Sequence, residues 1–265
     1  MTDSLFGADA YTPAQIAERV RTVGVQKTRL PWSTSALLGV MAGAFIGLGA
    51  LMFTLVASDA SLGFAAQRLV GGMVFSLGLL LVVVAGAELF TGNNLIVMAW
   101  ASGQVRTGEL LRNWALVGFA NLIGATALAT LVWMSGHTAM HDGAIARTTV
   151  AIATAKAGLP LAEAFCRGVL CNVLVCMAVW MGFAGRSVTD RAVAIVFPVT
   201  AFVAAGFEHS IANLYFFPLA WLLGAPLPFV DVLANLAVVV AGNLVGGSVL
   251  VALVYWVVYL RPRGP

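Results

Sequence analysis

Two stretches decide the fold: Ala85–Asn93, with the sequence AGAELFTGN, and Ala205–Asn213, with the sequence AGFEHSIAN. Each is a short polar interruption inside a long apolar run, which covers 64–102 in the first case and 192–223 in the second. Because a helix crosses a bilayer with about 20 apolar residues, each run is too long for one crossing. The sequence therefore predicts two membrane helices that are each interrupted midway.

The composition of the whole chain supports a polytopic membrane protein. Of 265 residues, 61% are hydrophobic and 9% are charged, whereas soluble domains are about 45–50% apolar and about 25% charged. Such a composition excludes an ordinary soluble globule. We expect an all-α protein with six spans, at 35–56, 64–86 continuing to 102, 114–134, 164–183, 192–206 continuing to 223, and 232–260.

The chain divides into a pore domain and two short ends. Residues 1–30 are predicted to form a cytoplasmic N-terminal segment with a short amphipathic helix, 31–260 the six-helix domain, and 261–265 a cytoplasmic tail. Most of the 14 Lys and Arg residues fall on the side that an even number of spans gives to both termini. By the positive-inside rule, that side is the cytoplasmic one. The predicted location is a bacterial inner membrane.

The two halves of the chain resemble each other. Glu88 and Asn93 recur as Glu208 and Asn213, 120 residues later, and the sequence NLIG at 121–124 is answered by NLVG at 243–246. With three spans in each half, the second half enters the membrane with opposite polarity. An inverted repeat with an interrupted helix in each half indicates a transport pathway near the midplane.

Ionisable residues within the spans are the sharpest functional signal, since a charge near the bilayer centre is costly. Beyond the span ends they are Glu88, Glu208 and His209, all at the interruptions. An interruption exposes backbone N–H groups, so we interpret the two glutamates, together with Asn93 and Asn213, as braces of these loops. His209 donates or accepts hydrogen bonds near neutral pH and is predicted to face the lumen.

The residues around the interruptions are candidates for the centre and the walls of a pathway. Gly92 is expected to let the backbone turn. Thr91 bonds either its own loop or the opposing His209. The bulky apolar residues near the interruptions are core residues or an apolar constriction that excludes hydrated ions. They are Phe75, Leu79, Leu89, Phe90 and Phe202.

Other chemistries have little support in the sequence. The three cysteines show no paired spacing, and we expect them to pack within their helix. His137, His141 and Asp142 form at best a weak loop metal site, so no metal and no cofactor are predicted. Nucleotide, metalloprotease and serine-hydrolase motifs are missing, and an enzyme and a nucleic-acid partner are not expected. The water-channel repeat Asn-Pro-Ala is missing too.

At these residues the chain resembles the formate/nitrite transporter family. Ala87–Asn93 looks like the signature of its broken second helix, and Gly206–Asn213 like that of its broken fifth helix. Gly168–Trp180, with the sequence GVLCNVLVCMAVW, is similar to its fourth helix. The resemblance extends from about Lys27 to Leu260.

The resemblance implies a homopentamer in the lipid bilayer, with an aquaporin-like fold and one pore per protomer that passes small monovalent anions such as formate and nitrite. It places His209 and Thr91 at the pore centre. It assigns Leu79, Leu89 and Phe90 to an inner constriction and Phe75 and Phe202 to an outer one. The family's vestibule residues correspond to Lys156, Asn172 and Lys27.

These residues suggest a hypothesis for conduction. Dehydrating a bare anion costs several kcal/mol, whereas protonating an acid of pKa about 4 at pH 7 costs roughly 4 kcal/mol. In one model His209 supplies or stabilises that proton, and His209→Asn abolishes flux. In the other, a fixed cationic His209 binds the anion without transfer.

Three alternatives stay open beside a formate channel. Within the family, the alternative is a nitrite or hydrosulfide channel. A water or glycerol channel would be detected by osmotic swelling. An intramembrane enzyme that uses Ser76 or Ser210 with His209 would react with a serine-directed phosphonate. The physiological anion, the direction of flux, proton coupling and gating by the N-terminal helix are not determined by the sequence.

Overall fold

The computed structural model of the chain describes residues 10–262. Residues 1–9 of the predicted N-terminal segment and 263–265 of the predicted tail lie outside the described residues. Within 10–262 the regular structure is helical, and the single β-bridge pairs Ala10 with Gly185. The prediction of an all-α membrane protein is confirmed at this level.

The first half of the chain contains an N-terminal helix, three long helices and the two short consecutive helices η1 and α4. Their bounds are α1 Pro13–Arg29, α2 Trp32–Ala57, α3 Phe64–Ala85, η1 Gly92–Ile96, α4 Val97–Ala101 and α5 Thr107–Met134. The expected second span, 64–86 with its continuation to 102, is thus divided between α3 and the pair η1 and α4.

The second half has a similar order of elements. Their bounds are η2 His137–Ala139, α6 Ala144–Ala157, α7 Leu161–Gly182, α8 Val188–Ala204, α9 Ser210–Leu222, α10 Phe229–Leu244, the π-helical η3 Val245–Leu253 and α11 Val254–Tyr259. The connection between α5 and α7 contains the helix α6, whose Ala153 packs with Phe217 and Ala220 of α9.

Within residues 10–262, five helical stretches are long and apolar enough to cross a membrane. They are Trp32–Ala57, Phe64–Ala85, Thr107–Met134, Leu161–Gly182 and Phe229–Tyr259, with mean hydropathy between 1.8 and 2.3. The remaining expected span, 192–206 with its continuation to 223, is divided between α8 with 17 residues and α9 with 13. The exposed faces of the long helices and of α8 carry large apolar side chains, such as Phe119 of α5 at 63% and Phe197 of α8 at 71% exposure. Such faces suit contact with lipid or a neighbouring protomer.

Glycines allow the long helices to approach closely. A Cβ atom on Gly43 of α2 would overlap the backbone of Asn121 in α5, and one on Gly246 of η3 would overlap the backbone of Val169 in α7. Small residues at helix interfaces let backbones approach within membranes. The pairs α2–α5 and α7–α10, the latter with its continuation η3, are therefore closely packed, and the central segments lie against them.

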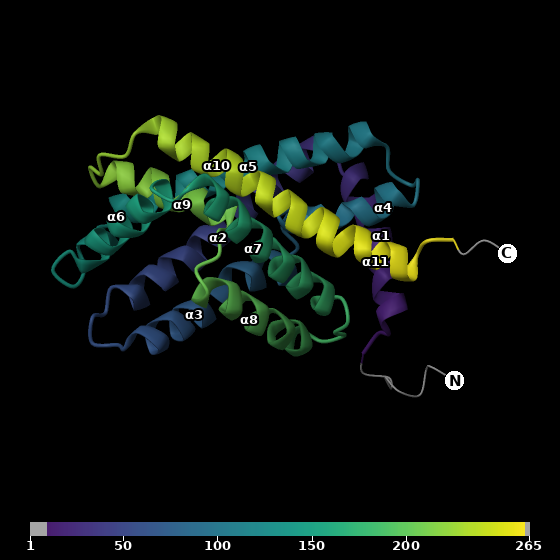
Figure 1. Ribbon diagram of the computed structural model, residues 1–265, viewed down its shortest axis with the longest axis horizontal. Coiled ribbons are helices and arrows are strands. Elements are labelled where there is room, and N and C mark those ends of the chain that lie inside the picture. Colours follow the sequence, from purple (N-terminus) through teal and green to yellow (C-terminus); the bar gives the residue numbers. More distant parts are fainter. Residues whose placement is uncertain (1–9, 263–265) are drawn as a thin grey trace.

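The N-terminal helix α1 packs on the protein. Thr12 caps it in a capping box with Gln15, and its buried residues Ile16 and Val20 share a core cluster with Ile96 of η1. The apolar face of this amphipathic helix is covered by η1 and α4. Figure 1 shows α1, α4 and α11 together at one end of the molecule and α6 at the other.

Candidate functional site

Two segments without regular helix, 86–91 and 205–209, form the centre of the site. Each contains near its start a glycine in the left-handed conformation, Gly86 with φ 81° and Gly206 with φ 74°. A side chain disfavours this conformation, so glycine is required where α3 and α8 end. The sequence assigned the turn to Gly92. That residue begins η1 and is not among the glycines with positive φ, so the turn belongs to Gly86.

The carboxylate of Glu88 braces the first segment. Lys27 donates to Glu88 Oε1 at 2.7 Å, and Asn93 Nδ2 donates to Glu88 Oε2 at 2.7 Å. Asn93 Nδ2 also donates to Asn113 Oδ1 at 3.0 Å, and Lys27 to Asn93 Oδ1 at 3.0 Å. The Glu88 side chain is only 5% exposed, so these contacts compensate a buried charge.

The carboxylate of Glu208 braces the second segment in the same way. Lys156 donates to Glu208 Oε1 at 2.9 Å, and Asn213 Nδ2 donates to Glu208 Oε2 at 2.8 Å. Asn213 Nδ2 also donates to Asn235 Oδ1 at 3.0 Å, and Asn235 donates to the Lys156 carbonyl at 2.8 Å. Here Asn213 Oδ1 is buried without a partner within residues 10–262. The two clusters therefore match around the carboxylate and differ in two contacts: Lys27 has Asn93 Oδ1 as a second acceptor, and Asn235 donates to the Lys156 carbonyl.

A further asparagine pair fixes the backbone of the two segments. Asn121 donates to the carbonyls of Gly39 at 2.8 Å and Glu88 at 2.9 Å. Asn243 donates to the carbonyls of Gly168 at 2.8 Å and Glu208 at 3.0 Å. Both asparagines also accept through Oδ1, from the N–H of Phe90 and of Ser210 respectively. Backbone groups that a helix would have paired are thus satisfied by side chains.

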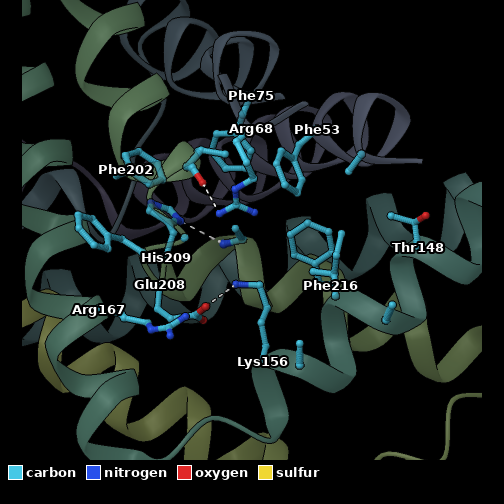
Figure 2. Close-up of a pocket in the computed structure, with 18 of the residues that line it drawn as sticks. Phe53, Arg68, Phe75, Thr148, Lys156, Arg167, Phe202, Glu208, His209 and Phe216 are labelled. Atoms are coloured by element: carbon cyan, nitrogen blue, oxygen red, sulfur yellow. Dashed lines mark hydrogen bonds and ion pairs between the residues drawn. The ribbon is translucent and has the colours of Figure 1, made fainter. Parts of the chain in front are cut away.

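Each of these segments lines one cavity. The Lys156 cavity, of about 470 Å³, is reached by Lys156, Glu208, His209, Phe75 and Phe202 (Figure 2). The Lys27 cavity, of about 430 Å³, is reached by Lys27, Glu88, Asn93, Leu79 and Leu89. Each cavity therefore contains one lysine–glutamate ion pair and ends at apolar side chains.

His209, which lines the Lys156 cavity, meets Thr91, which lines neither cavity. Thr91 Oγ1 lies 3.1 Å from His209 Nε2, and both side chains are buried. His209 is also the N-cap of α9, where its Nδ1 accepts the N–H of Ala212 at 3.1 Å. Since an accepting Nδ1 carries no proton, the proton of a neutral imidazole is on Nε2 and is donated to Thr91 Oγ1. The hydroxyl proton of Thr91 then has no acceptor within the described residues.

Four of the five predicted constriction residues line the cavities. Phe75 and Phe202 face the Lys156 cavity, their rings 5.8 Å apart at 84°, and the Phe202 ring stacks on His209 at 5.9 Å. Leu79 and Leu89 face the Lys27 cavity. All four are at most 4% exposed. Phe90 lines neither cavity, and its ring lies beside Gly118 of α5.

Asn172 was assigned to a vestibule, but it is fully buried and lines neither cavity. Its Nδ2 lies 2.7 Å from the Asn243 carbonyl, 3.1 Å from Asn94 Oδ1 and 3.3 Å from the Thr91 carbonyl. The side chain therefore ties α7 to the first central segment, to η1 and to α10.

The sequence did not single out Asn113, Asn235, Arg68 or Arg191 as site residues. The two asparagines follow the braced ones by 20 and 22 residues, and that recurrence was a usable signal. Arg68 and Arg191 line the Lys156 and Lys27 cavities respectively. Each stands near the start of a helix, where a charge ordinarily marks a span end.

The other candidate chemistry does not assemble in the described part of the chain. No group of three or more His, Cys, Asp or Glu side chains in residues 10–262 is placed to hold a metal ion, and this includes His137, His141 and Asp142. All three cysteines are free; Cys166 is exposed, and Cys171 and Cys176 are buried in α7.

The fold and the site define a helical membrane protein with two cavities, each lined by a lysine–glutamate ion pair, and with a buried His–Thr pair. Residues 14–257 match the family model described as formate/nitrite transporter. The chain is 40% identical to the formate channel FocA of Escherichia coli (strain K12) over 96% of each protein. The chain therefore belongs to the formate/nitrite transporter family.

Solved structures of similar proteins agree. A structure titled pentameric formate channel with formate bound is 38% identical, with a TM-score of 0.80 over 87% of this chain and 98% of the other. An FNT family ion channel is 30% identical, with a TM-score of 0.84 over 92% of this chain and 98% of the other.

Proposed function

We propose that the chain is a formate channel in which the Lys156 cavity and the Lys27 cavity are the two vestibules of one pore. The His209–Thr91 pair between them is the observation that carries this proposal, because it is a buried polar contact flanked by apolar side chains. A relative 40% identical over nearly its whole length is a formate channel. Phe75, Phe202, Leu79 and Leu89 form the apolar walls on either side of the pair.

The same proposal includes the finer architecture. The matched clusters around Glu88 and Glu208 support six spans in two inverted three-helix repeats, with α3–α4 and α8–α9 as the interrupted helices in an aquaporin-like arrangement. Residues 31–260 form the pore domain, with α1 as part of the 1–30 segment and 261–265 as the tail. The excess of basic residues beside the termini places both in the cytoplasm, so that the Lys27 cavity is the inner vestibule.

The assembly that we propose is a homopentamer in a bacterial inner membrane. A structural neighbour 38% identical is titled a pentameric channel. Exposed apolar side chains on the long helices, such as Leu131 at 63% and Leu37 at 69%, are available for protomer or lipid contact. Each protomer contains both cavities, so each has its own pore.

At the centre, His209 acts as a hydrogen-bond donor and not as a store of protons. Its Nδ1 already accepts the N–H of Ala212, so the neutral ring cannot release the Nε2 proton without leaving an imidazolate. The free Thr91 hydroxyl proton is then directed to a carboxylate oxygen. Formate is protonated in a vestibule and crosses the apolar walls as the neutral acid, because protonating the carboxylate costs roughly 4 kcal/mol at pH 7. A bare ion pays several kcal/mol in desolvation.

Uptake of labelled formate into proteoliposomes tests the function. Saturable uptake that rises between an external pH of about 7 and about 5, and that nitrite inhibits weakly, supports a formate channel coupled to protons. Uptake of nitrite without formate leaves the family assignment intact and shows that the alternative substrate is correct. Osmotic swelling with glycerol in the same vesicles separates both from a neutral-solute channel.

A further inference from the structure

The lysines of the two vestibules contribute little net positive charge. Lys156 Nζ lies 2.9 Å from Glu208 Oε1 and Lys27 Nζ lies 2.7 Å from Glu88 Oε1. Both carboxylates are buried, at 4% and 5% exposure of the side chain. An anion that approaches either lysine therefore meets an ion pair whose charges largely cancel.

Arg68 supplies the missing charge in the Lys156 cavity. Its Nε donates to the Ala204 carbonyl and its Nη2 to the Val203 carbonyl, both at 2.9 Å, and it forms no ion pair with a carboxylate within residues 10–262. Figure 2 shows the guanidinium group pointing into the cavity beside the ring of Phe53, whose centroid is 6.0 Å from Cζ. The two backbone contacts use one edge of the guanidinium. The Nη1–Nη2 edge, which fits the two oxygens of a carboxylate, remains available.

Arg191 occupies the corresponding place in the Lys27 cavity. It lies in the first turn of α8, lines this cavity together with Lys27, and forms no ion pair in the described part of the chain. Its neighbour Asp190 is engaged with the backbone of the preceding loop, where it accepts from Arg186 N at 3.0 Å and Ser187 N at 2.9 Å. The charge of Arg191 is therefore not compensated locally.

The two arginines follow one rule of placement. Arg68 stands near the start of α3, and Arg191 near the start of α8. Arg68 on α3 reaches the Lys156 cavity, whose lysine–glutamate pair braces the segment after α8. Arg191 on α8 reaches the Lys27 cavity, whose pair braces the segment after α3. Arg167 also lines the Lys156 cavity, but it is paired with Glu163 at 3.0 Å. One cation without a carboxylate partner thus stands in each cavity, at matching positions.

We propose that Arg68 and Arg191 are the anion-docking residues of the two vestibules, where each guanidinium captures a planar monocarboxylate before it reaches His209. The inference rests on the proposed function and adds two docking sites to the proposed pore. Capture by charge raises the local concentration of the anion and lowers the half-saturating concentration on that side, with little effect on the maximal rate.

The test compares formate transport from each side in membrane vesicles of the two opposite orientations. Arg68→Gln is expected to raise the half-saturating formate concentration about three- to tenfold from the Lys156 side, the range of a unit charge a few ångströms away in a hydrated cavity. Arg191→Gln has the same effect from the Lys27 side only. Arg68→Lys keeps the charge but loses the edge that fits two carboxylate oxygens, so its half-saturating concentration is expected between those of the wild type and Arg68→Gln. The differences shrink at an ionic strength of about 1 M set with potassium sulfate, where the Debye length is about 3 Å.

Matched controls remove a positive charge outside the cavities: Arg147→Gln in α6 and Arg106→Gln before α5, both exposed. If the half-saturating concentration is unchanged in Arg68→Gln and Arg191→Gln, the proposal is overturned. It is also overturned if Arg68→Lys binds as weakly as Arg68→Gln, because that result assigns Arg68 to bracing α8. If the wild type carries nitrite but not formate, the same comparison in nitrite tests the arginines, and only the substrate is wrong. If the wild type carries no anion, both proposals fail.

Discussion

Replacing the buried glutamates by glutamine should separate the two otherwise matched clusters. In each cluster one carboxylate oxygen accepts from a lysine and the other from an asparagine. A glutamine must therefore place its NH₂ group against a donor in both. The lysines differ: Lys27 retains Asn93 Oδ1 at 3.0 Å as a second acceptor, while Lys156 has only Glu208 among the described side chains.

The magnitude follows from burial. Removing one partner of a fully buried ion pair costs about 3–5 kcal/mol, and the lysine side chains are 16% exposed at Lys156 and 25% at Lys27. We expect Glu208→Gln to lower the free energy of unfolding by about 3 kcal/mol, near the lower end of that range. Glu88→Gln should lower it by about half as much, because a charge-assisted hydrogen bond worth about 1.5 kcal/mol or more is retained.

The chain contains its own reporters for the measurement. Cys171 and Cys176 are buried in α7, and Cys166 is exposed, so a thiol-reactive dye in a Cys166→Ser background reports unfolding in detergent. At about 2–4 °C per kcal/mol, Glu208→Gln should lower the apparent melting temperature by about 6–12 °C. An equal or larger shift in Glu88→Gln would refute the reasoning. Replacing both Lys156 and Glu208 by methionine should recover much of the loss, since a buried pair contributes little net stability.

Three further predictions follow from single contacts. His209→Gln, whose amide can still reach Thr91, should retain formate flux within about tenfold of wild type, while His209→Asn loses that reach and falls further; proteoliposome uptake that is abolished equally in both would instead favour a proton relay. Gly43→Ala should prevent stable folding because its Cβ overlaps the backbone of α5, whereas Gly108→Ala, with open space around it, should leave the size-exclusion profile unchanged. Ser248→Ala removes a buried hydroxyl that has no hydrogen-bond partner in residues 10–262, so the melting temperature should stay constant or rise slightly.

The local features of the central segments could be predicted from sequence because they depend on residue type. A polar interruption with a glycine, a glutamate and an asparagine five residues later indicates a braced loop wherever it folds, and Glu88–Asn93 has that contact. Its recurrence at Glu208–Asn213 identified the matching cluster. The sequence left two interpretations open for Thr91, a bond to its own loop or a contact with His209. The packing of α3 against α8 brings Thr91 and His209 together.

The direction of individual side chains could not be predicted. Phe90 and Leu89 are neighbours of similar character, yet one packs on α5 and the other faces a cavity, because successive residues in an irregular segment point to different sides. Asn172 is polar and was placed in a vestibule, but it lies in the interior, where its amide donates to the carbonyls of Thr91 in the first interruption and Asn243 in α10. Arg68 resembles an ordinary span-end charge until its cavity is known.

The most direct test of the account is whether the two cavities are the ends of one path. In a cysteine-free background, Ala212→Cys places a thiol beside His209 in the Lys156 cavity, and Ala87→Cys places one in the Lys27 cavity. A membrane-impermeant thiosulfonate should label each from one side only, opposite for the two, and each modification should stop formate flux. Reaction of both from the same side, or full flux after complete modification of either, would contradict a single path through His209 and Thr91.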